Sequence, residues 1–313
     1  MADVKKIATR DGYGQALVEL GQAHDNIVVL DADLAGATKT GTFKKAFPDR
    51  HLNFGIAEGN MMSAAAGLAA VGMVPFASSF AMFASGRAFE QIRNSIGYPH
   101  LNVKIGASHG GISVGEDGAS HQCCEDFALM RSIPGMVVMS PADNVEVIAM
   151  VKAAYEYEGP VYIRTGRAAV PVFHEEGFNF QIGKGEVVRD GSDVAIIANG
   201  LMVYEAMKAG EALAEEGINA MIINMATIKP LDEELVLEAA RKCGKVITCE
   251  EHSVIGGLGE AVCAVLSEKL PTPVKRIGVN DVFGRSGPAA DLLKMYGLSA
   301  ENIIKTAKEF LGK

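Results

Sequence analysis

The sequence predicts an α/β fold of two doubly wound domains, and three observations support this prediction. Apolar runs of strand length alternate with amphipathic stretches of helix length through most of the 313 residues, a rhythm typical of parallel sheets with helices on both faces. The rhythm stops between residues 171 and 191 and then restarts. The composition, with 49% hydrophobic and 21% charged residues, describes a globular protein with a sizeable core.

The first domain is expected to span residues 1–184, since the break in the pattern falls near 180–191. Strands are predicted where short apolar runs lie between turn residues, at 26–31, 74–77, 103–107, 136–139 and 159–163. Helices are predicted at 13–23, 59–71 and 145–155, the last after a strand-to-helix turn at 140–143.

The second domain is expected to span residues 190–313 and to be the smaller of the two, close to the usual size of one domain. Strands are predicted at 194–198, 220–224 and 245–249. Helices are predicted to end near 216, to begin at Asp232 and to follow Gly259.

Residues 59–86 form an uncharged stretch between Glu58 and Arg87. Its length alone could span a bilayer, but Gly67, Gly72 and Pro75 interrupt it. We therefore predict a helix, a turn, a short strand and a second helix rather than a membrane segment. An uncharged unit of this kind indicates burial on all sides, for instance at a subunit interface.

The overall charge and the cysteines narrow the class of protein. A net charge of −9 argues against nucleic acid and anionic membranes as partners. None of the five cysteines forms a CxxC pair, which argues against a zinc or redox motif. Because the first residues contain no apolar region of the signal-peptide type, we expect a cytoplasmic protein with reduced thiols.

The GGLG run at 256–259 follows a predicted strand and opens a predicted helix. Such a helix start can cradle a phosphate, but the dinucleotide fingerprint needs a glycine where Val262 stands. We favour a tight turn with close backbone packing. The acidic residues Glu250 and Glu251, just before the run, also disfavour binding of a phosphate there.

Glu58 stands at the start of the apolar helix, and two interpretations of it remain open. It is either a helix-start carboxylate that satisfies the helix dipole or a buried acid poised to hold or donate a proton, because burial raises a carboxyl pKa. Further on, Phe80 and Phe83 are predicted to share one face of the second helix. Such a pair, taken alone, indicates core packing.

The densest group of polar residues is the Gly-rich loop, which we define as residues 109–122, HGGISVGEDGASHQ. It follows a predicted strand, and loops at the carboxyl ends of parallel strands are where open α/β sheets bind ligands. Metal binding is a competing interpretation, but His109 and His121 lack helical spacing and no cysteine assists them. A solvated loop without function is the third possibility, although so many glycines in one polar loop need a reason.

Taken in order, five segments resemble the C-terminal half of transketolase, which comprises a pyrimidine-binding domain and a C-terminal domain. The segments are Asp33, GIAEGN at 55–60, SSFAMF at 78–83, the Gly-rich loop, and YIRTGR at 162–167. The resemblance covers essentially the whole chain. The Gly-rich loop is specific to the family, whereas the other segments are weak singly and strong in this order.

The resemblance implies that the chain binds the aminopyrimidine of thiamine diphosphate. Glu58 would be catalytic, because in the family a glutamate hydrogen-bonds N1′ and favours the imino tautomer, which takes the proton from the thiazolium carbon. Phe80 and Phe83 would pack on the pyrimidine, and Asp33 would lie close to the cofactor. The family's tyrosine is replaced here by Gly86, which puts that wall of the pocket in doubt.

The resemblance also implies roles in binding a sugar phosphate. Asp117 would recognise a sugar hydroxyl, and His121 would act near the reacting C1–C2 end of the sugar. Three residues, Arg10, His109 and Arg167, would grip the phosphate, a task that suits bidentate arginine. Arg164 could substitute for Arg167. A serine that often completes this group is Ala37 here, so that Thr38 or a backbone N–H would replace it.

Transketolases hold magnesium and diphosphate with a Gly-Asp-Gly…Asn motif in their N-terminal half, and this sequence contains no Gly-Asp-Gly. The resemblance therefore implies a split transketolase of the pentose phosphate pathway. An N-terminal partner subunit would hold the diphosphate and Mg²⁺. The expected assembly is α2β2, with no metal site on this chain.

Three other functions remain open for this sequence. The β subunit of a 2-oxoacid dehydrogenase shares the fold and the glutamate, but the paired histidines around GEDG favour a ketolase. A deoxyxylulose-phosphate synthase-like chain is closer, because it also carries GIAE and an Asp-Gly-x-x-His run. A non-catalytic pyrimidine- or nucleotide-binding module is opposed by the retention of Glu58, His109, Asp117 and His121.

Overall fold

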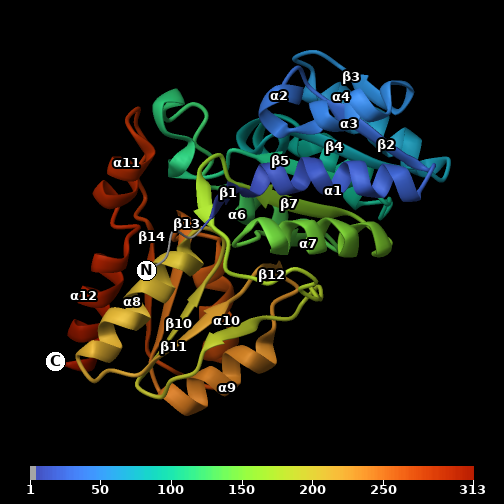
Figure 1. Cartoon of the computed structure of the whole chain (residues 1–313). Coiled ribbons are helices and arrows are strands. Elements are labelled where there is room, and N and C mark those ends of the chain that lie inside the picture. The colour runs from blue at the N-terminus through green and yellow to red at the C-terminus, as the bar shows by residue number, and fades with distance from the viewer. Residues whose placement is uncertain (1–4) are drawn as a thin grey trace.

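The computed structural model describes residues 5–313, and its larger sheet has seven strands in the order β12-β6-β7-β5-β4-β2-β3 (Figure 1). Neighbouring strands are parallel except β12, which pairs antiparallel with β6. The strands are β2 (Ile27–Asp31), β3 (His51–Asn53), β4 (Val74–Phe80), β5 (Lys104–Ser108), β6 (Val137–Met139), β7 (Val161–Thr165) and β12 (Thr227–Lys229).

Helices cover both faces of this sheet, as predicted. One face carries α1 (Thr9–Ala23), α3 (Thr40–Ala46) and α7 (Asn144–Glu156). The other carries α4 (Glu58–Ala70), α6 (Asp126–Arg131) and an irregular helix made of π-helical turns at Met82–Arg87 and Ile92–Gly97 around α5 (Phe89–Gln91). The short α2 (Ala35–Thr38) follows β2.

A second, five-stranded sheet has the order β14-β13-β10-β11-β9 and is parallel except at β9. Its strands are β9 (Glu186–Arg189), β10 (Val194–Ala198), β11 (Ala220–Asn224), β13 (Val246–Ser253) and β14 (Val274–Val279). One face packs on α8 (Met202–Glu215) and α12 (Ala300–Leu311), and the other on α9 (Glu233–Cys243) and α10 (Leu258–Lys269). The remaining elements are α11 (Ala289–Met295) and the two-stranded pair β1 (Lys6–Ala8) and β8 (Ala169–Pro171).

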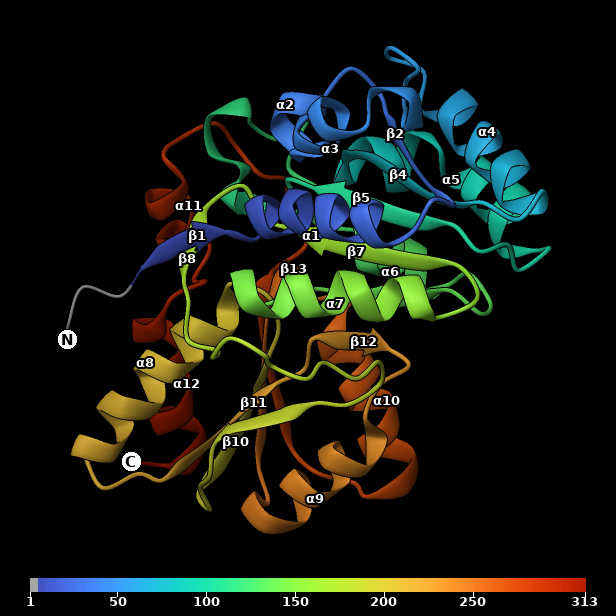
Figure 2. The same cartoon turned by 45° about the vertical axis from the view of Figure 1, so that its right-hand side comes forward.

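The two sheets lie one above the other, with α7 between the first sheet and the second domain (Figure 2). The start of α7 follows from its sequence, because the Asp143 carboxylate accepts the N–H of Glu146 at 2.9 Å, a standard helix cap. The start of α9 is capped in the same way by Asp232, and α9 ends at Gly244 in the left-handed conformation that glycine favours.

Every predicted strand is present within a few residues of its expected place, but one prediction about the uncharged stretch is wrong. Phe80 is the last residue of β4, and only Phe83 is helical, in the first π-helical turn. The helix α4 exposes Asn60, Ser63 and Gly67 in the single chain, so its burial at a subunit interface stays a prediction. Among residues 5–313, no helix combines the length and apolar character needed to cross a membrane.

Gly106 in β5 leaves room for a contact between α1 and β4. The Tyr13 hydroxyl and Ser78 Oγ hydrogen-bond at 2.8 Å across it. A Cβ at Gly106 would lie 2.1 Å from Tyr13 Oη and 2.9 Å from Ser78 Oγ. The side chains of Tyr13 and Ser78 are fully buried, so neither can move aside without disturbing the core.

We therefore expect Gly106→Ala to lower the free energy of unfolding by roughly 1–3 kcal/mol, as overpacking does. Gly67→Ala is the control, because an added Cβ there meets nothing within 4 Å and the site is an exposed helix position. It should raise stability by about 0.5–1 kcal/mol. Urea denaturation of the purified chain measures both, and equal effects would contradict the packing argument.

Candidate active site

The carboxyl ends of the parallel strands meet at one edge of the first sheet, and most predicted site residues lie there. Glu58 follows β3, Phe80 ends β4, His109 follows β5 and Arg167 follows β7. In open α/β sheets this edge binds ligands where the strand order reverses. Here β3 and β4 lie on opposite sides of β2, which places the reversal beside Glu58 and Phe80.

Glu58 is the first residue of α4, and its side chain is only 2% exposed. Arg87 Nη1 donates to both carboxylate oxygens at 3.0 Å. Arg87 itself is half exposed, and its guanidinium lies 4.4 Å from the centre of the Phe83 ring. Sequence reasoning missed Arg87, although Glu58 and Arg87 are the two charges that flank the uncharged stretch.

Four aromatic side chains, which we call the ring cluster, pack together at this edge. The His109 ring stacks on Phe80 with centroids 3.9 Å apart. Phe83 lies 5.9 Å from Phe80 with nearly parallel rings, and His121 meets Phe83 edge-on at 5.2 Å. The aromatics predicted to bind the cofactor are therefore in direct contact with the histidines predicted to bind the sugar.

The space beside Gly86 is filled from within the same turn. A Cβ at Gly86 would lie 2.2 Å from Met82 Cε, so that the methionine methyl occupies the room that a side chain at position 86 would need. Met82, Phe83 and Arg87 then line one side of a groove of about 560 Å³. Val282 and Phe283 of the second domain line the opposite side.

Arg10, His109 and Arg167 form what we call the anion cluster. Arg10 Nη1 lies 3.4 Å from His109 Nε2, and His109 Nδ1 lies 2.8 Å from Ser108 Oγ. Since a guanidinium can only donate, Nε2 must accept and Nδ1 must carry the proton that goes to Ser108. His109 therefore presents a neutral imidazole to Arg10.

The electrostatics of this cluster favour an anion. Burial, followed by the charges of Arg10, Arg167 and His121, lowers the pKa of His109 to about 3. A nearby negative charge would offset the mutual repulsion of these positive groups. Arg167 is paired with Glu116 at 2.7 Å, but both side chains are partly exposed, 37% and 63%, so that a ligand can compete with this weak pair.

The residues expected to complete the anion cluster, at positions 37 and 38, make other contacts than expected. Thr38, one of the two expected replacements for the missing serine, is buried and donates to Asp31 Oδ2 at 2.9 Å, which leaves a backbone N–H as the other. The Ala37 carbonyl accepts a hydrogen bond from Arg10 at 3.0 Å and orients that guanidinium. Asp33 and Asp117 are both exposed, and their roles beside the cofactor and the sugar stay predictions.

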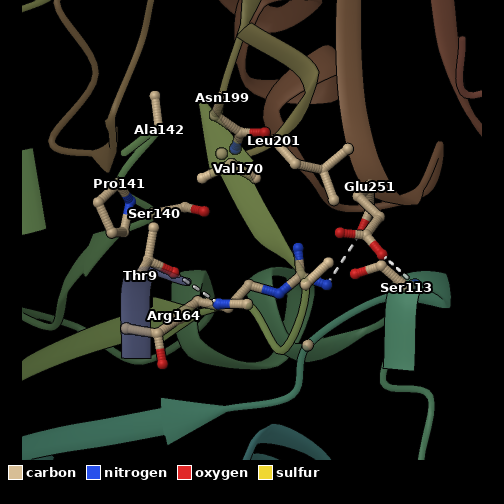
Figure 3. A pocket seen from close by; sticks show the side chains of 15 residues that line it. Thr9, Ser113, Ser140, Pro141, Ala142, Arg164, Val170, Asn199, Leu201 and Glu251 are labelled. Carbon is tan, nitrogen blue, oxygen red and sulfur yellow. Dashed lines mark hydrogen bonds between the residues drawn. The ribbon is translucent and has the colours of Figure 1, made fainter. Parts of the chain in front are cut away.

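Arg164 lies apart from the anion cluster, buried between the two domains (Figure 3). Its Nε is 3.2 Å from Asp126 Oδ2, and its Nη2 donates to the carbonyls of Cys123 and Glu251. Burial alone would lower the pKa of Arg164, but the charges of Asp126 and Glu251 raise it above its usual value. The charge of Arg164 is thus compensated by Asp126, and its Nη2 is occupied by two carbonyls, which leaves Arg167 as the better candidate for a phosphate.

The positions of Arg164 and Glu251 explain why two residues of the Gly-rich loop are glycines. A Cβ at Gly110 would lie 1.8 Å from Arg164 Nε, and one at Gly111 would lie 2.4 Å from Glu251 Cδ. The Glu251 carboxylate also accepts the N–H of Ser113. Close packing against Arg164 of the first domain and Glu251 of the second, rather than contact with a ligand, therefore requires these two glycines.

A small cavity lies beside Arg164, lined by Ser113, Asn199 and Glu251 among others (Figure 3). Its volume of about 30 Å³ is enough for roughly two water molecules. Ser113 Oγ and Asn199 Nδ2 are buried there without a protein partner, and ordered water can satisfy both. This cavity is too small for a sugar phosphate.

The second domain also holds the Gly-rich loop from its other side. Gln122 Nε2 donates to the carbonyls of Ile112 and Gly115 in the loop at 3.2 Å, and to the carbonyl of Arg285 in the second domain at 2.9 Å. Ser286 Oγ donates to the carbonyl of Glu116. The loop is therefore fixed at both ends and in the middle.

The GGLG run forms a tight turn, the favoured interpretation. The N–H groups of Leu258 and Gly259, at the start of α10, donate to the Glu250 carboxylate at 2.7 and 2.8 Å. A Cβ at Gly257 would lie 2.0 Å from that carboxylate. The helix start thus binds its own acidic residue.

Comparison with known proteins assigns both halves of the chain. The family model described as "Transketolase, pyrimidine binding domain" matches residues 5–172, and "Transketolase, C-terminal domain" matches residues 183–303. Similar proteins include a putative transketolase C-terminal section of Methanocaldococcus jannaschii, 54% identical over 97% of this chain and 96% of that protein.

Two further relatives are similar over nearly their whole length. A 6-deoxy-6-sulfo-D-fructose transketolase subunit of a Clostridium species is 44% identical over 96% of this chain and 93% of that protein. A solved structure of a split-gene transketolase, an inactive β4 tetramer, is 55% identical and covers 98% of this chain and 99% of its own, with a TM-score of 0.91.

Arg164 and Arg167 should respond differently to removal of their charge. We expect Arg164→Met to lower the free energy of unfolding by roughly 3–5 kcal/mol, because it leaves Asp126 buried without its cation. Arg167→Met, which breaks a partly exposed pair, should cost less than about 1 kcal/mol. Chemical denaturation of the two variants measures this difference, and a larger loss for Arg167→Met would reverse the assignment.

Proposed function

The chain belongs to the transketolase family, and from that premise we propose that it is the C-terminal subunit of a split, thiamine diphosphate-dependent transketolase. Its reaction would transfer a two-carbon ketol unit between phosphorylated ketoses and aldoses of the pentose phosphate pathway. The observation that carries the proposal is the meeting of Glu58, the ring cluster and the anion cluster at one edge of the sheet.

The residues present fit the aminopyrimidine of the cofactor. Phe80 and Phe83 lie together with nearly parallel rings, Met82 closes the wall beside Gly86, and Met82, Phe83 and Arg87 line the 560 Å³ groove. Glu58 supplies a buried carboxyl group that Arg87 joins to this groove. A flat, partly polar ring needs such apolar faces together with one well-placed hydrogen-bonding group.

The cofactor, when bound, supplies a carbon nucleophile and an electron sink. Glu58 would hold a proton at N1′, and the buried surroundings of its carboxyl group would keep water from competing for that hydrogen bond. His121, in contact with Phe83, would lie where the cofactor meets the sugar. His109, Arg10 and Arg167 would hold the far, anionic end of the sugar.

A second subunit would hold the diphosphate and Mg²⁺, because the sequence lacks the Gly-Asp-Gly motif used for them in the family. The relative whose β4 tetramer is inactive supports the idea that the C-terminal part needs its partner. We propose an α2β2 assembly in the cytoplasm, where the five cysteines, all free in the structure, would stay reduced.

The proposed substrates carry an anionic group at the end remote from the reacting carbons. Two arginines around a neutral imidazole suit a phosphate dianion, which can accept several charge-assisted hydrogen bonds. The relative named for 6-deoxy-6-sulfo-D-fructose acts on a sugar with a sulfonate group. That relative supports an anionic sugar terminus as the feature recognised by this type of subunit.

The first test uses Glu58→Gln. Mixed with a partner subunit that carries Gly-Asp-Gly…Asn, the wild-type chain should show ketol transfer that depends on thiamine diphosphate, whereas the chain alone should show none. Glu58→Gln should reduce turnover by roughly 10²–10⁴, the usual loss for one proton-handling group. Its unfolding free energy should change little, because Arg87 is half exposed and can turn to water.

Glu90→Gln is the matched control, since Glu90 is an exposed carboxylate beside the same irregular helix. It should keep full turnover. Normal turnover of Glu58→Gln with the cofactor bound would remove Glu58 from the mechanism.

The second test concerns the anion cluster. Arg167→Ala should cost roughly 1.5–3 kcal/mol in transition-state stabilisation on erythrose 4-phosphate or ribose 5-phosphate, mostly through KM, because the phosphate is remote from the reacting carbons. With unphosphorylated glycolaldehyde or glyceraldehyde as acceptor, kcat/KM should stay nearly unchanged. Equal losses on both kinds of acceptor would mean that Arg167 is structural.

A further inference from the structure

Arg87 makes two contacts in this chain that no part of the proposed mechanism uses. Its Nη1 donates to both oxygens of Glu58, and its guanidinium lies over the face of the Phe83 ring, 4.4 Å from the centroid. A guanidinium is planar, stacks on aromatic faces and matches a carboxylate. It can therefore satisfy a buried acid and an aromatic face at the same time.

These are the two contacts that the proposed function asks of the aminopyrimidine ring, namely a hydrogen bond with Glu58 and flat packing on the neighbouring aromatics. Resting on the proposed function, we propose that Arg87 is a positioning residue for Glu58 and competes with the aminopyrimidine for it. In the free chain Arg87 holds the carboxylate in place. Productive cofactor binding then requires the pair to open.

The burial of the two partners decides which one moves. The Glu58 side chain is 2% exposed and the Arg87 side chain 51% exposed. A buried carboxylate cannot leave its site, and leaving it without a partner is costly. A half-exposed arginine can turn into water at small cost. The arginine is therefore the mobile partner, and Glu58 stays where the cofactor needs it.

The local backbone suits such a movement. Arg87 is the last residue of the π-helical turn Met82–Arg87 and follows Gly86, which has no side chain to restrict it. The Arg87 side chain also lines the 560 Å³ groove, so that it has open space to enter. π-Helical turns occur frequently at functional sites.

The pairing also affects what Glu58 can do. With both oxygens accepting from Arg87 Nη1, the carboxyl group is already occupied and cannot hydrogen-bond a ring nitrogen at the same time. The closed pair is thus not competent for the hydrogen bond proposed above. The apparent dissociation constant of the cofactor is the intrinsic one divided by the fraction of chains in which the pair is open.

The test is the affinity of the reconstituted complex for thiamine diphosphate with Mg²⁺, measured by titration calorimetry without substrate. Arg87→Met keeps the length of the side chain but removes the competing charge, and we expect it to bind the cofactor roughly fivefold more tightly, as for loss of a half-exposed ion pair. Arg93→Met is the matched control, because Arg93 is exposed on the same irregular helix and bonds only to Asn94. It should bind like the wild type.

A double-mutant cycle separates competition from a general effect of the substitution. In a Glu58→Gln background there is no ion pair to open, so Arg87→Met should no longer tighten binding. Arg87→Lys keeps the positive charge but lacks the planar guanidinium, and we expect it to give an intermediate affinity. It provides a second variant in case the methionine variant misfolds.

The possible outcomes distinguish this inference from the function on which it rests. If the wild-type complex binds thiamine diphosphate and Arg87→Met binds it equally or more weakly, Arg87 does not compete and the inference is wrong while the proposed function stands. If the wild-type complex does not bind thiamine diphosphate at all, both are wrong.

Discussion

The buried guanidinium of Arg164 is the contact on which the geometry of the candidate site depends. It comes from β7 and bonds to Asp126 at the start of α6, to the carbonyl of Cys123 and to the carbonyl of Glu251 in the second domain. Tyr162 also donates to Asp126 at 2.8 Å. All these groups are buried, so separating the two domains would leave the Arg164 charge without its partners. The free-energy penalty for doing so stabilises one arrangement of the domains.

The Gly-rich loop takes its shape from this contact. Gly110 and Gly111 let the backbone pass against Arg164 and Glu251, and the loop thereby carries His109 onto Phe80. On the other side, Gln122 joins the loop to Arg285. All residues of the ring and anion clusters belong to the first domain, yet contacts with the second domain fix the loop that carries His109 and His121.

The sequence predicted the strands, and the place of several candidate site residues at their ends, more completely than the contacts that support those residues. Residues such as Glu58, Phe80 and His109 follow strand ends, and a parallel sheet brings strand ends to one edge whatever the details of packing. Arg87, Met82 and the place of Arg164 depend on side-chain contacts across the fold, which no local pattern encodes. The glycines of the loop were expected to serve a ligand, but at positions 110 and 111 they serve packing.

The late position of β12 in the sequence affects how the first sheet folds during synthesis of the chain. Residues 227–229 belong to the second half of the sequence, yet they complete the first sheet by pairing with β6. As the chain leaves the ribosome, the first sheet keeps an unpaired strand edge until about fifty further residues after the break have been synthesised, on the order of a few seconds. An unpaired edge invites association with other chains. The break near 180–191 therefore separates two patterns in the sequence, but it does not separate two independent steps of folding.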